Sequence, residues 1–131
     1  MTTELTVLAW AVVLGLVHLA VVGALFTAEN GLAYGVSSRE TPAKPLTGMA
    51  GRLERAFRNF METFPFAAAA ILIAALANRH NGYTIWGSQL YFWGRLAYAP
   101  VYGVGIPVLR SVIWLIATLG IVLVLLGLVW G

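Results

Sequence analysis

Long apolar stretches separated by short polar segments make up the sequence. A helix of roughly 20 apolar residues crosses the hydrocarbon core of a bilayer, and four stretches are about that long. We therefore predict transmembrane helices over residues 5–28, 51–78, 84–102 and 107–130. Because no repeat and no change of composition divides the chain, residues 1–131 are expected to form a single membrane domain. The predicted fold class is all-α, an integral membrane four-helix bundle.

Turn-forming residues separate the four apolar stretches. Residues 29–47 contain an Asn-Gly pair, a Ser-Ser pair and two prolines, which is typical of a loop. Residues 78–82 read Asn-Arg-His-Asn-Gly, a short polar turn. Pro107 is predicted to lie in the first turn of a helix, where its missing N–H costs no hydrogen bond. The first stretch is not expected to be a cleaved signal peptide, because no Lys or Arg precedes it and it exceeds the usual apolar length.

Composition excludes an ordinary soluble domain. Hydrophobic residues make up 60% of the chain and charged residues 10%, whereas soluble domains are about 45–50% apolar and about 25% charged. The absence of cysteine excludes disulfides, thiolate metal sites and a sulfur nucleophile belonging to the protein. All five acids are glutamates and there are two histidines. With so few ligands available, no metal site is predicted.

The distribution of Lys and Arg predicts the orientation in the membrane. Arg79 lies alone on one side, and the other seven basic residues lie on the opposite side: Arg39, Lys44, Arg52, Arg55, Arg58, Arg95 and Arg110. Positively charged segments stay preferentially in the cytoplasm. We therefore expect a multi-pass protein of the inner or plasma membrane, with both termini outside and the charged loops in the cytoplasm.

Charged and polar residues share one face of the second predicted span. Arg55, Asn59 and Glu62 are spaced i, i+4, i+7 and therefore lie on the same side of a helix. Arg58 is four residues before Glu62, a spacing that allows the two to pair. Ionised groups cost several kcal/mol in a bilayer. These side chains are therefore expected to face each other, a water-filled cavity or a bound polar ligand.

The third and fourth predicted spans carry matching polar residues. Arg95, Tyr98 and Tyr102 are spaced i, i+3, i+7 and share a helix face. The fourth span begins with the pair Arg110 and Ser111. By the predicted topology, all of these residues lie in the cytoplasmic half of the bundle.

Two interpretations of this cluster remain open. The first is a network of ion pairs that only holds the helices together. The second is an anion site, because the arginines at positions 55, 58, 95 and 110 outnumber Glu62, the only acid at that depth. A net-positive cluster with one acceptor suits a zwitterionic small molecule with excess negative charge.

Other residues of the spans have structural interpretations. His18 is expected to be a hydrogen-bonded packing histidine rather than a proton carrier. Pro65 and Pro100 are expected to kink their helices, because each removes a backbone N–H. Small residues at helical spacing, such as Gly120 and Gly127, permit close helix contact either within or between subunits.

The ordered combination of these motifs resembles the MAPEG family, the membrane-associated proteins in eicosanoid and glutathione metabolism, in its prokaryotic form. The resemblance rests on Arg-Ala-x-x-Asn-x-x-Glu-x-Phe-Pro at residues 55–65, Arg-x-x-Tyr-x-x-x-Tyr at residues 95–102, and Arg-Ser at residues 110–111. It covers the whole chain in length and layout. The chain departs from the mammalian enzymes in having no basic residue at the end of its first span and a slightly shorter segment between Tyr102 and Arg110.

The resemblance implies a homotrimer that holds glutathione, as co-substrate, between neighbouring subunits on the cytoplasmic side. It assigns the thiolate-stabilising role to Arg110, with Ser111 beside it. The residues that it implies for glutathione binding, with Arg58 as an additional carboxylate contact, are Arg55, Arg58, Asn59, Glu62, Arg95, Tyr98 and Tyr102.

The predicted function is a glutathione-dependent membrane transferase or peroxidase acting on hydrophobic electrophiles. A thiol with a pKa of about 8.5 is mostly protonated at neutral pH, and a guanidinium at a helix N-terminus favours its thiolate. The expected partners are copies of the same chain, membrane lipids and a hydrophobic small-molecule substrate, with no nucleic acid.

Two alternatives belong to other classes. One is a non-catalytic membrane protein of the same fold, whose buried charges only hold the trimer together. The other is a small four-helix drug transporter. The transporter is disfavoured because residues 5–28 contain no glutamate and because the charge bias opposes dual topology.

Overall fold

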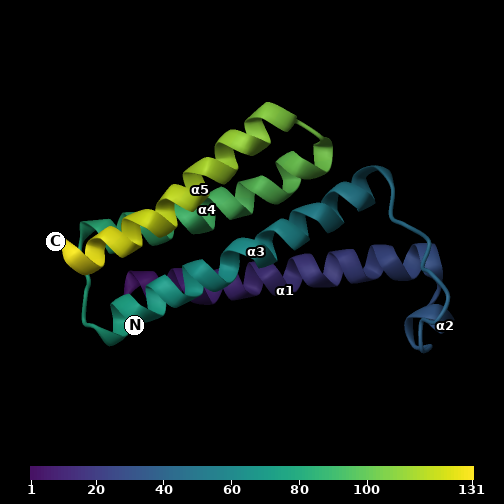
Figure 1. Cartoon of the computed structure of the whole chain (residues 1–131), viewed down its shortest axis with the longest axis horizontal. Coiled ribbons are helices and arrows are strands. Elements are labelled where there is room, and N and C mark those ends of the chain that lie inside the picture. The colour runs from purple at the N-terminus through teal and green to yellow at the C-terminus, as the bar shows by residue number, and fades with distance from the viewer.

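The structure is a computed structural model that describes all residues, 1–131, and it is entirely helical. The helices are α1 (Thr3–Asn30), α2 (Leu32–Gly35), α3 (Gly48–Leu76), α4 (Gly82–Val104) and α5 (Pro107–Val129). Four of them are long and run side by side, whereas α2 is a single turn in the connection between α1 and α3 (Figure 1). The all-α prediction is confirmed.

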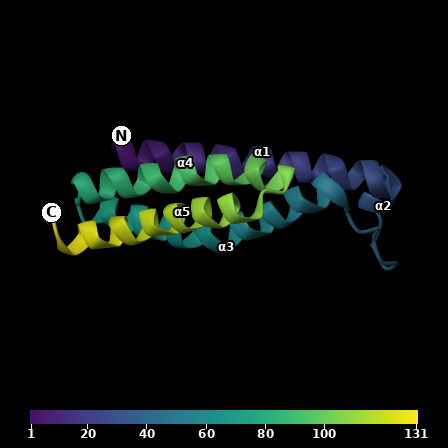
Figure 2. The same ribbon diagram turned by 90° about the horizontal axis from the view of Figure 1, so that it is seen from above.

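The connections divide the bundle into two ends. Both termini and the α3–α4 turn lie at one end, and the α4–α5 turn and the beginning of α3 lie at the other (Figure 1). Turned by 90°, the four long helices form two layers, with α1 and α4 above α3 and α5 (Figure 2). We call the end that holds the α4–α5 turn the arginine end, because Arg52, Arg55 and Arg110 lie there.

Three of the helices, α1, α3 and α5, are long and apolar enough to cross a membrane. Helix α4 has 23 residues, the same length as α5, but it carries more polar side chains. It packs most extensively against α5. A membrane crossing by α4 stays a prediction.

Small side chains dominate the core, which therefore brings the helices close together. The central cluster comes from α3, α4 and α5 and consists of Ala67, Ala70, Ile71, Ala74, Tyr91, Ala117, Ile121 and Val124. The closest approach is between α4 and α5. There, a Cβ added at Gly87 would lie 2.5 Å from the carbonyl oxygen of Gly120, and one added at Gly127 would lie 2.7 Å from Thr84 Cγ2. The small residues of α5 thus serve helix contact within the chain.

Polar contacts hold α1 to the rest of the bundle at two levels. At the end with the termini, the buried carboxylate of Glu4 accepts hydrogen bonds from His80 Nδ1 at 2.8 Å and from Thr84 Oγ1 at 3.2 Å. Further along α1, Nε2 of the buried His18 donates to the carbonyl oxygen of Leu53 at 2.9 Å. His18 therefore has the hydrogen-bonded packing position that the sequence predicts.

Both internal prolines lie within continuous helices, Pro65 in α3 and Pro100 in α4. Proline cannot donate to the carbonyl four residues earlier, so the carbonyls of Met61 and Leu96 lose their usual partners. Met61 directly precedes Glu62. The carbonyl that loses its usual donor therefore lies beside one of the predicted site residues.

Candidate functional site

A cavity at the arginine end carries three guanidinium groups and no acid. It has a volume of about 330 Å³ and is lined by Arg52, Arg55, Tyr102, Gly105, Pro107 and Arg110. These residues come from the first turns of α3, the end of α4 and the start of α5. We call it the arginine cavity. Its uncompensated positive charge favours an anionic ligand.

Tyr102 organises two of the three arginines. Cζ of Arg110 lies 4.5 Å from the centroid of the Tyr102 ring, within the range of a cation–π contact. The Nε–H of Arg55 donates to the Tyr102 hydroxyl at 3.3 Å. Although the segment between Tyr102 and Arg110 is short, the side chains of Tyr102 and Arg110 are in contact.

Arg52 is the charged member of the cavity that the sequence motifs did not assign to the site. Its Nε–H donates to the carbonyl oxygen of Gly103 at 2.8 Å. A signal was present, because Arg52 and Arg55 are three residues apart and therefore neighbours on one helix face. The motif that carries the family resemblance begins at Arg55, so Arg52 lies just outside it.

A second polar group lies deeper in the bundle around Arg95. This side chain is buried, and its Nη1–H donates to Oδ1 of Asn59 at 2.9 Å. Its Cζ lies 4.1 Å from the ring centroid of Tyr98 and 5.7 Å from that of Phe60. Its Nε is buried without a hydrogen-bond partner. The structure thus brings together Arg95, Asn59 and Tyr98, as a contact between α3 and α4.

The remaining predicted residues lie on the surface of the single chain. Arg58 is exposed and pairs with Glu54 at 3.7 Å, so the Arg58–Glu62 pair that the spacing allowed does not form. Glu62 is exposed and takes part in neither of the chain's two ion pairs. The exposed Ser111 donates its hydroxyl to the carbonyl oxygen of Pro107 at 3.1 Å. Within one chain these residues do not line the arginine cavity.

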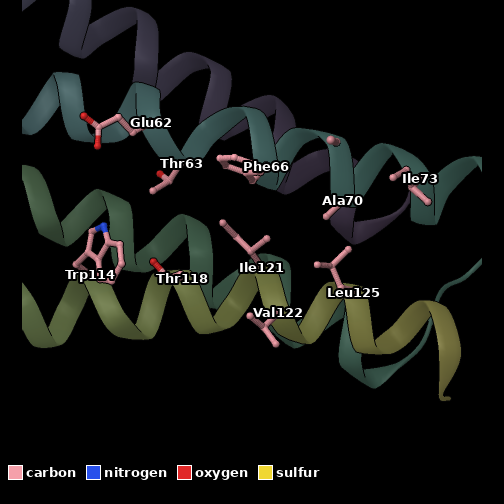
Figure 3. Close-up of a pocket in the computed structure, with 11 residues that line it drawn as sticks. Glu62, Thr63, Phe66, Ala70, Ile73, Trp114, Thr118, Ile121, Val122 and Leu125 are labelled. Atoms are coloured by element: carbon pink, nitrogen blue, oxygen red, sulfur yellow. The ribbon is translucent and has the colours of Figure 1, made fainter.

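An apolar groove of about 520 Å³ runs between α3 and α5 (Figure 3). Glu62 and Thr63 of α3 lie at the same end of the groove as Trp114 of α5, on opposite sides of it (Figure 3). Hydrophobic side chains such as Phe66 and Leu125 line the rest. The indole Nε1 of Trp114 is buried without a hydrogen-bond partner. The lining of the groove suits an apolar molecule.

The groove and the arginine cavity are adjacent along the helices. Arg110 lines the cavity and Trp114 lines the groove, one turn apart on α5. On α3, Arg55 lies in the cavity and Glu62 in the groove, two turns apart. No group of three or more potential ligands lies close enough together to hold a metal ion.

An all-helical chain with three membrane-capable helices and a basic cavity at one end defines an integral membrane protein. The family model described as the MAPEG family matches residues 5–130, nearly the whole chain, so the protein belongs to the MAPEG family. This membership confirms the resemblance and makes it a membrane protein of the glutathione and eicosanoid metabolism family. A comparison with curated proteins gives no match.

Proposed function

We propose that the protein is a glutathione-dependent membrane transferase or peroxidase that acts on hydrophobic electrophiles. The observation that supports this most directly is the arginine cavity, with three guanidinium groups and no acid, one helical turn from an apolar groove. Such a pair of sites suits a reaction between an anionic, water-soluble thiol and an apolar substrate. Family membership supports the same pairing of substrates.

In the proposed reaction Arg110 stabilises the thiolate of glutathione. Arg110 is in the first turn of α5, whose N-cap residue Ile106 offers no side-chain hydrogen bond, so free backbone N–H groups and the helix dipole add positive potential there. Lowering the thiol pKa by one unit corresponds to about 1.4 kcal/mol of preference for the anion. In the transferase reaction the thiolate sulfur forms a bond to an electrophilic carbon while the leaving group departs with its electron pair. In the peroxidase reaction the thiolate sulfur attacks the terminal oxygen of a hydroperoxide, the O–O bond breaks, and the alkoxide leaves and takes up a proton from water to become the alcohol. The resulting sulfenic acid of glutathione then reacts with a second glutathione thiol to give the disulfide and water.

The binding roles follow from the charges left available. Arg55 suits a carboxylate of the tripeptide, and Glu62, free of any partner within the chain, suits its ammonium group. The exposed Arg58 and the amide nitrogen of Asn59 offer further contacts. Ser111 lies beside Arg110 and is assigned to the reacting end of the site. These assignments rest on the family motif and on the exposure of the side chains.

Arg95 and Tyr98 take a supporting role in this proposal. Because Arg95 is buried and already bound to Asn59, it holds that residue and Tyr98 in position. This differs from the sequence prediction, which made Arg95 a direct ligand of glutathione.

We further propose a homotrimer with glutathione between subunits, both termini outside the membrane and the arginine end in the cytoplasm. Large apolar side chains exposed on α1 and α5, among them Leu16 and Leu115, fit contact with lipid or with neighbouring subunits. Arg58 and Glu62 lie on the chain surface, where a neighbouring subunit can complete a shared site. The distribution of basic residues supports the orientation.

The main alternative is a non-catalytic protein of the same fold. The buried contact between Arg95 and Asn59 favours it, because this contact joins α3 to α4 without any ligand. In that case the arginines serve assembly alone.

Titration of the purified protein with glutathione tests the proposal. At 100 times its dissociation constant, a ligand stabilises the folded state by about 2.7 kcal/mol, which raises the Tm, and the ultraviolet absorbance of the bound thiolate rises with it. Arg110→Ala is expected to lose the thiolate signal while the oligomer remains intact, and Arg39→Ala, in an exposed loop, serves as control. Absence of any Tm shift at millimolar glutathione contradicts the proposal. Collapse of the oligomer in Arg110→Ala, with no activity in the wild type, supports the alternative.

A further inference from the structure

The carbonyl oxygen of Gly103 lacks the backbone partner that a helix would normally supply. In a continuing helix it would accept from the N–H of residue 107, but that residue is Pro107 and has none. The nearby amides are already used, since Gly105 N–H donates to Tyr102 and Val101, and Ile106 N–H donates to Val101. The carbonyl is therefore available to a donor from another element.

Arg52 supplies that donor from α3. Its Nε lies 2.8 Å from the Gly103 oxygen. The same guanidinium lies against Gly105, which has φ +83°, and a Cβ added there would lie 3.4 Å from Nε of Arg52. Positive charge at the C-terminus of a helix also interacts favourably with the helix dipole. One side chain thus fixes the end of α4 and the left-handed residue that follows it.

The turn that Arg52 fixes determines how Tyr102 and Arg110 face each other. Tyr102 immediately precedes Gly103, and Arg110 lies in the first turn of α5, just after Pro107. The ring of Tyr102 and the guanidinium of Arg110 are 4.5 Å apart. Movement of this turn would change the distance between Tyr102 and Arg110, because Tyr102 belongs to α4, Arg110 belongs to α5, and the turn joins these two helices.

We propose that Arg52 is a positioning residue that holds the α4–α5 turn and thereby sets Arg110 against Tyr102, while the rest of its guanidinium faces the arginine cavity and binds a carboxylate of the substrate. The consequence for glutathione rests on the proposed function, whereas the effect on the turn does not. Arginine suits both tasks because its Nε and its terminal nitrogens point in different directions in one rigid plane.

Two neutral variants separate the two tasks. Nε2 of glutamine occupies the same place along the side chain as Nε of arginine, so Arg52→Gln keeps the donor to Gly103 and removes the charge. Arg52→Met has a similar length but no donor. Arg39 provides matched controls, because it also donates to a backbone carbonyl, that of Gly35, in an exposed loop away from the cavity.

Hydrogen–deuterium exchange tests the turn without any ligand. The amides of residues 103–106 and 108–110 are expected to exchange about tenfold faster in Arg52→Met than in the wild type, since a hydrogen bond that restrains them is lost. Arg52→Gln and Arg39→Met are expected to exchange there as the wild type does. Wild-type exchange in Arg52→Met, or equal acceleration in Arg52→Gln, overturns the positioning role.

Kinetics and thiolate absorbance with glutathione then test the consequence for the site. Arg52→Gln is expected to raise KM for glutathione several-fold with kcat and the bound-thiol pKa near the wild-type values. Arg52→Met is expected to lower kcat as well and to raise the bound-thiol pKa, because Arg110 is displaced. Identical behaviour of the two variants overturns the division of roles. If the wild type itself does not bind glutathione, the proposed function fails, and the exchange experiment still decides the role of Arg52 in the turn.

Discussion

Arg95 of α4 donates Nη1–H to Oδ1 of Asn59 on α3 at 2.9 Å. Arg95 is only 3% exposed, so this contact gives its buried guanidinium a hydrogen-bond acceptor. Asn59 therefore joins two helices and also belongs to the family's ligand motif. Under the proposed function, this residue serves both helix packing and ligand binding.

Replacing Asn59 by alanine is expected to destabilise the fold. The substitution removes a hydrogen bond to a charged and buried group, a loss of about 1.5–3 kcal/mol. Denaturant unfolding in detergent measures the change in free energy. Arg58→Ala is the control, because its ion pair with Glu54 is exposed and such pairs contribute about 1 kcal/mol or less. Equal effects of the two substitutions contradict the importance of the Arg95 contact.

Tyr102→Phe is expected to weaken glutathione binding without changing the bound-thiol pKa. The variant loses the hydroxyl that accepts from Arg55 but keeps the ring beneath Arg110. A hydrogen bond of about 1 kcal/mol corresponds to an increase in Kd of about fivefold. Tyr102→Leu removes both contacts and is expected to raise the bound-thiol pKa as well. Calorimetric titration measures the binding, and thiolate absorbance measures the pKa of the bound thiol. A changed thiol pKa in Tyr102→Phe contradicts the assignment of the hydroxyl to binding and of the ring to the position of Arg110.

The contact between α4 and α5 predicts opposite effects for two Gly→Ala substitutions. At Gly87 the new Cβ meets the backbone of Gly120, so we expect a loss of about 1–3 kcal/mol. At Gly23 in α1 a Cβ meets nothing within 4 Å, and the better helix propensity of alanine is expected to change stability by at most about 1 kcal/mol, in the favourable direction. Thermal unfolding of the two variants compares them directly. Equal Tm values for Gly87→Ala and Gly23→Ala contradict the close packing inferred at Gly87.

The contact between Glu4 and His80 is expected to hold α1 at the end that carries both termini. His80→Ala leaves the buried carboxylate with only the Thr84 hydroxyl as donor, and we expect a loss of about 1–3 kcal/mol. In Glu4→Ala with His80→Ala, the combined loss is expected to be smaller than the sum of the single losses, because the two groups interact. A double-mutant cycle from denaturant unfolding measures the coupling. If the losses of the two single variants add up to that of the double variant, the contact between Glu4 and His80 does not contribute to stability.

The absence of cysteine makes the proposed topology testable with single added thiols. Gly82→Cys and Ser38→Cys both lie at exposed positions, at opposite ends of the bundle. A membrane-impermeant maleimide is expected to label Gly82→Cys on intact spheroplasts and Ser38→Cys only after permeabilisation. The reverse pattern places the arginine end outside and contradicts the proposed orientation.

Helical spacing predicted which polar residues of one helix share a face. Arg55 and Tyr102 were identified from single-helix periodicity, and the structure places them in contact. The spacing of Arg52 and Arg55 indicated a shared helix face, but the partner of Arg52 is a backbone carbonyl 51 residues away, and no local pattern encodes that hydrogen bond. Arg58 obeys the same i, i+4 rule toward Glu54 and toward Glu62, so spacing alone did not decide between them.

The sequence alone determined that this protein is helical and membrane-embedded, and through its motifs it determined the family. These properties depend on local hydropathy and on residue order, which every segment carries by itself. Only the tertiary structure decided that Arg95 is bound to Asn59, that three arginines share one cavity, and that Arg52 donates to the carbonyl of Gly103. The reason is physical, since these contacts depend on how closely α3, α4 and α5 approach, and that approach is set jointly by small side chains distributed over all three helices.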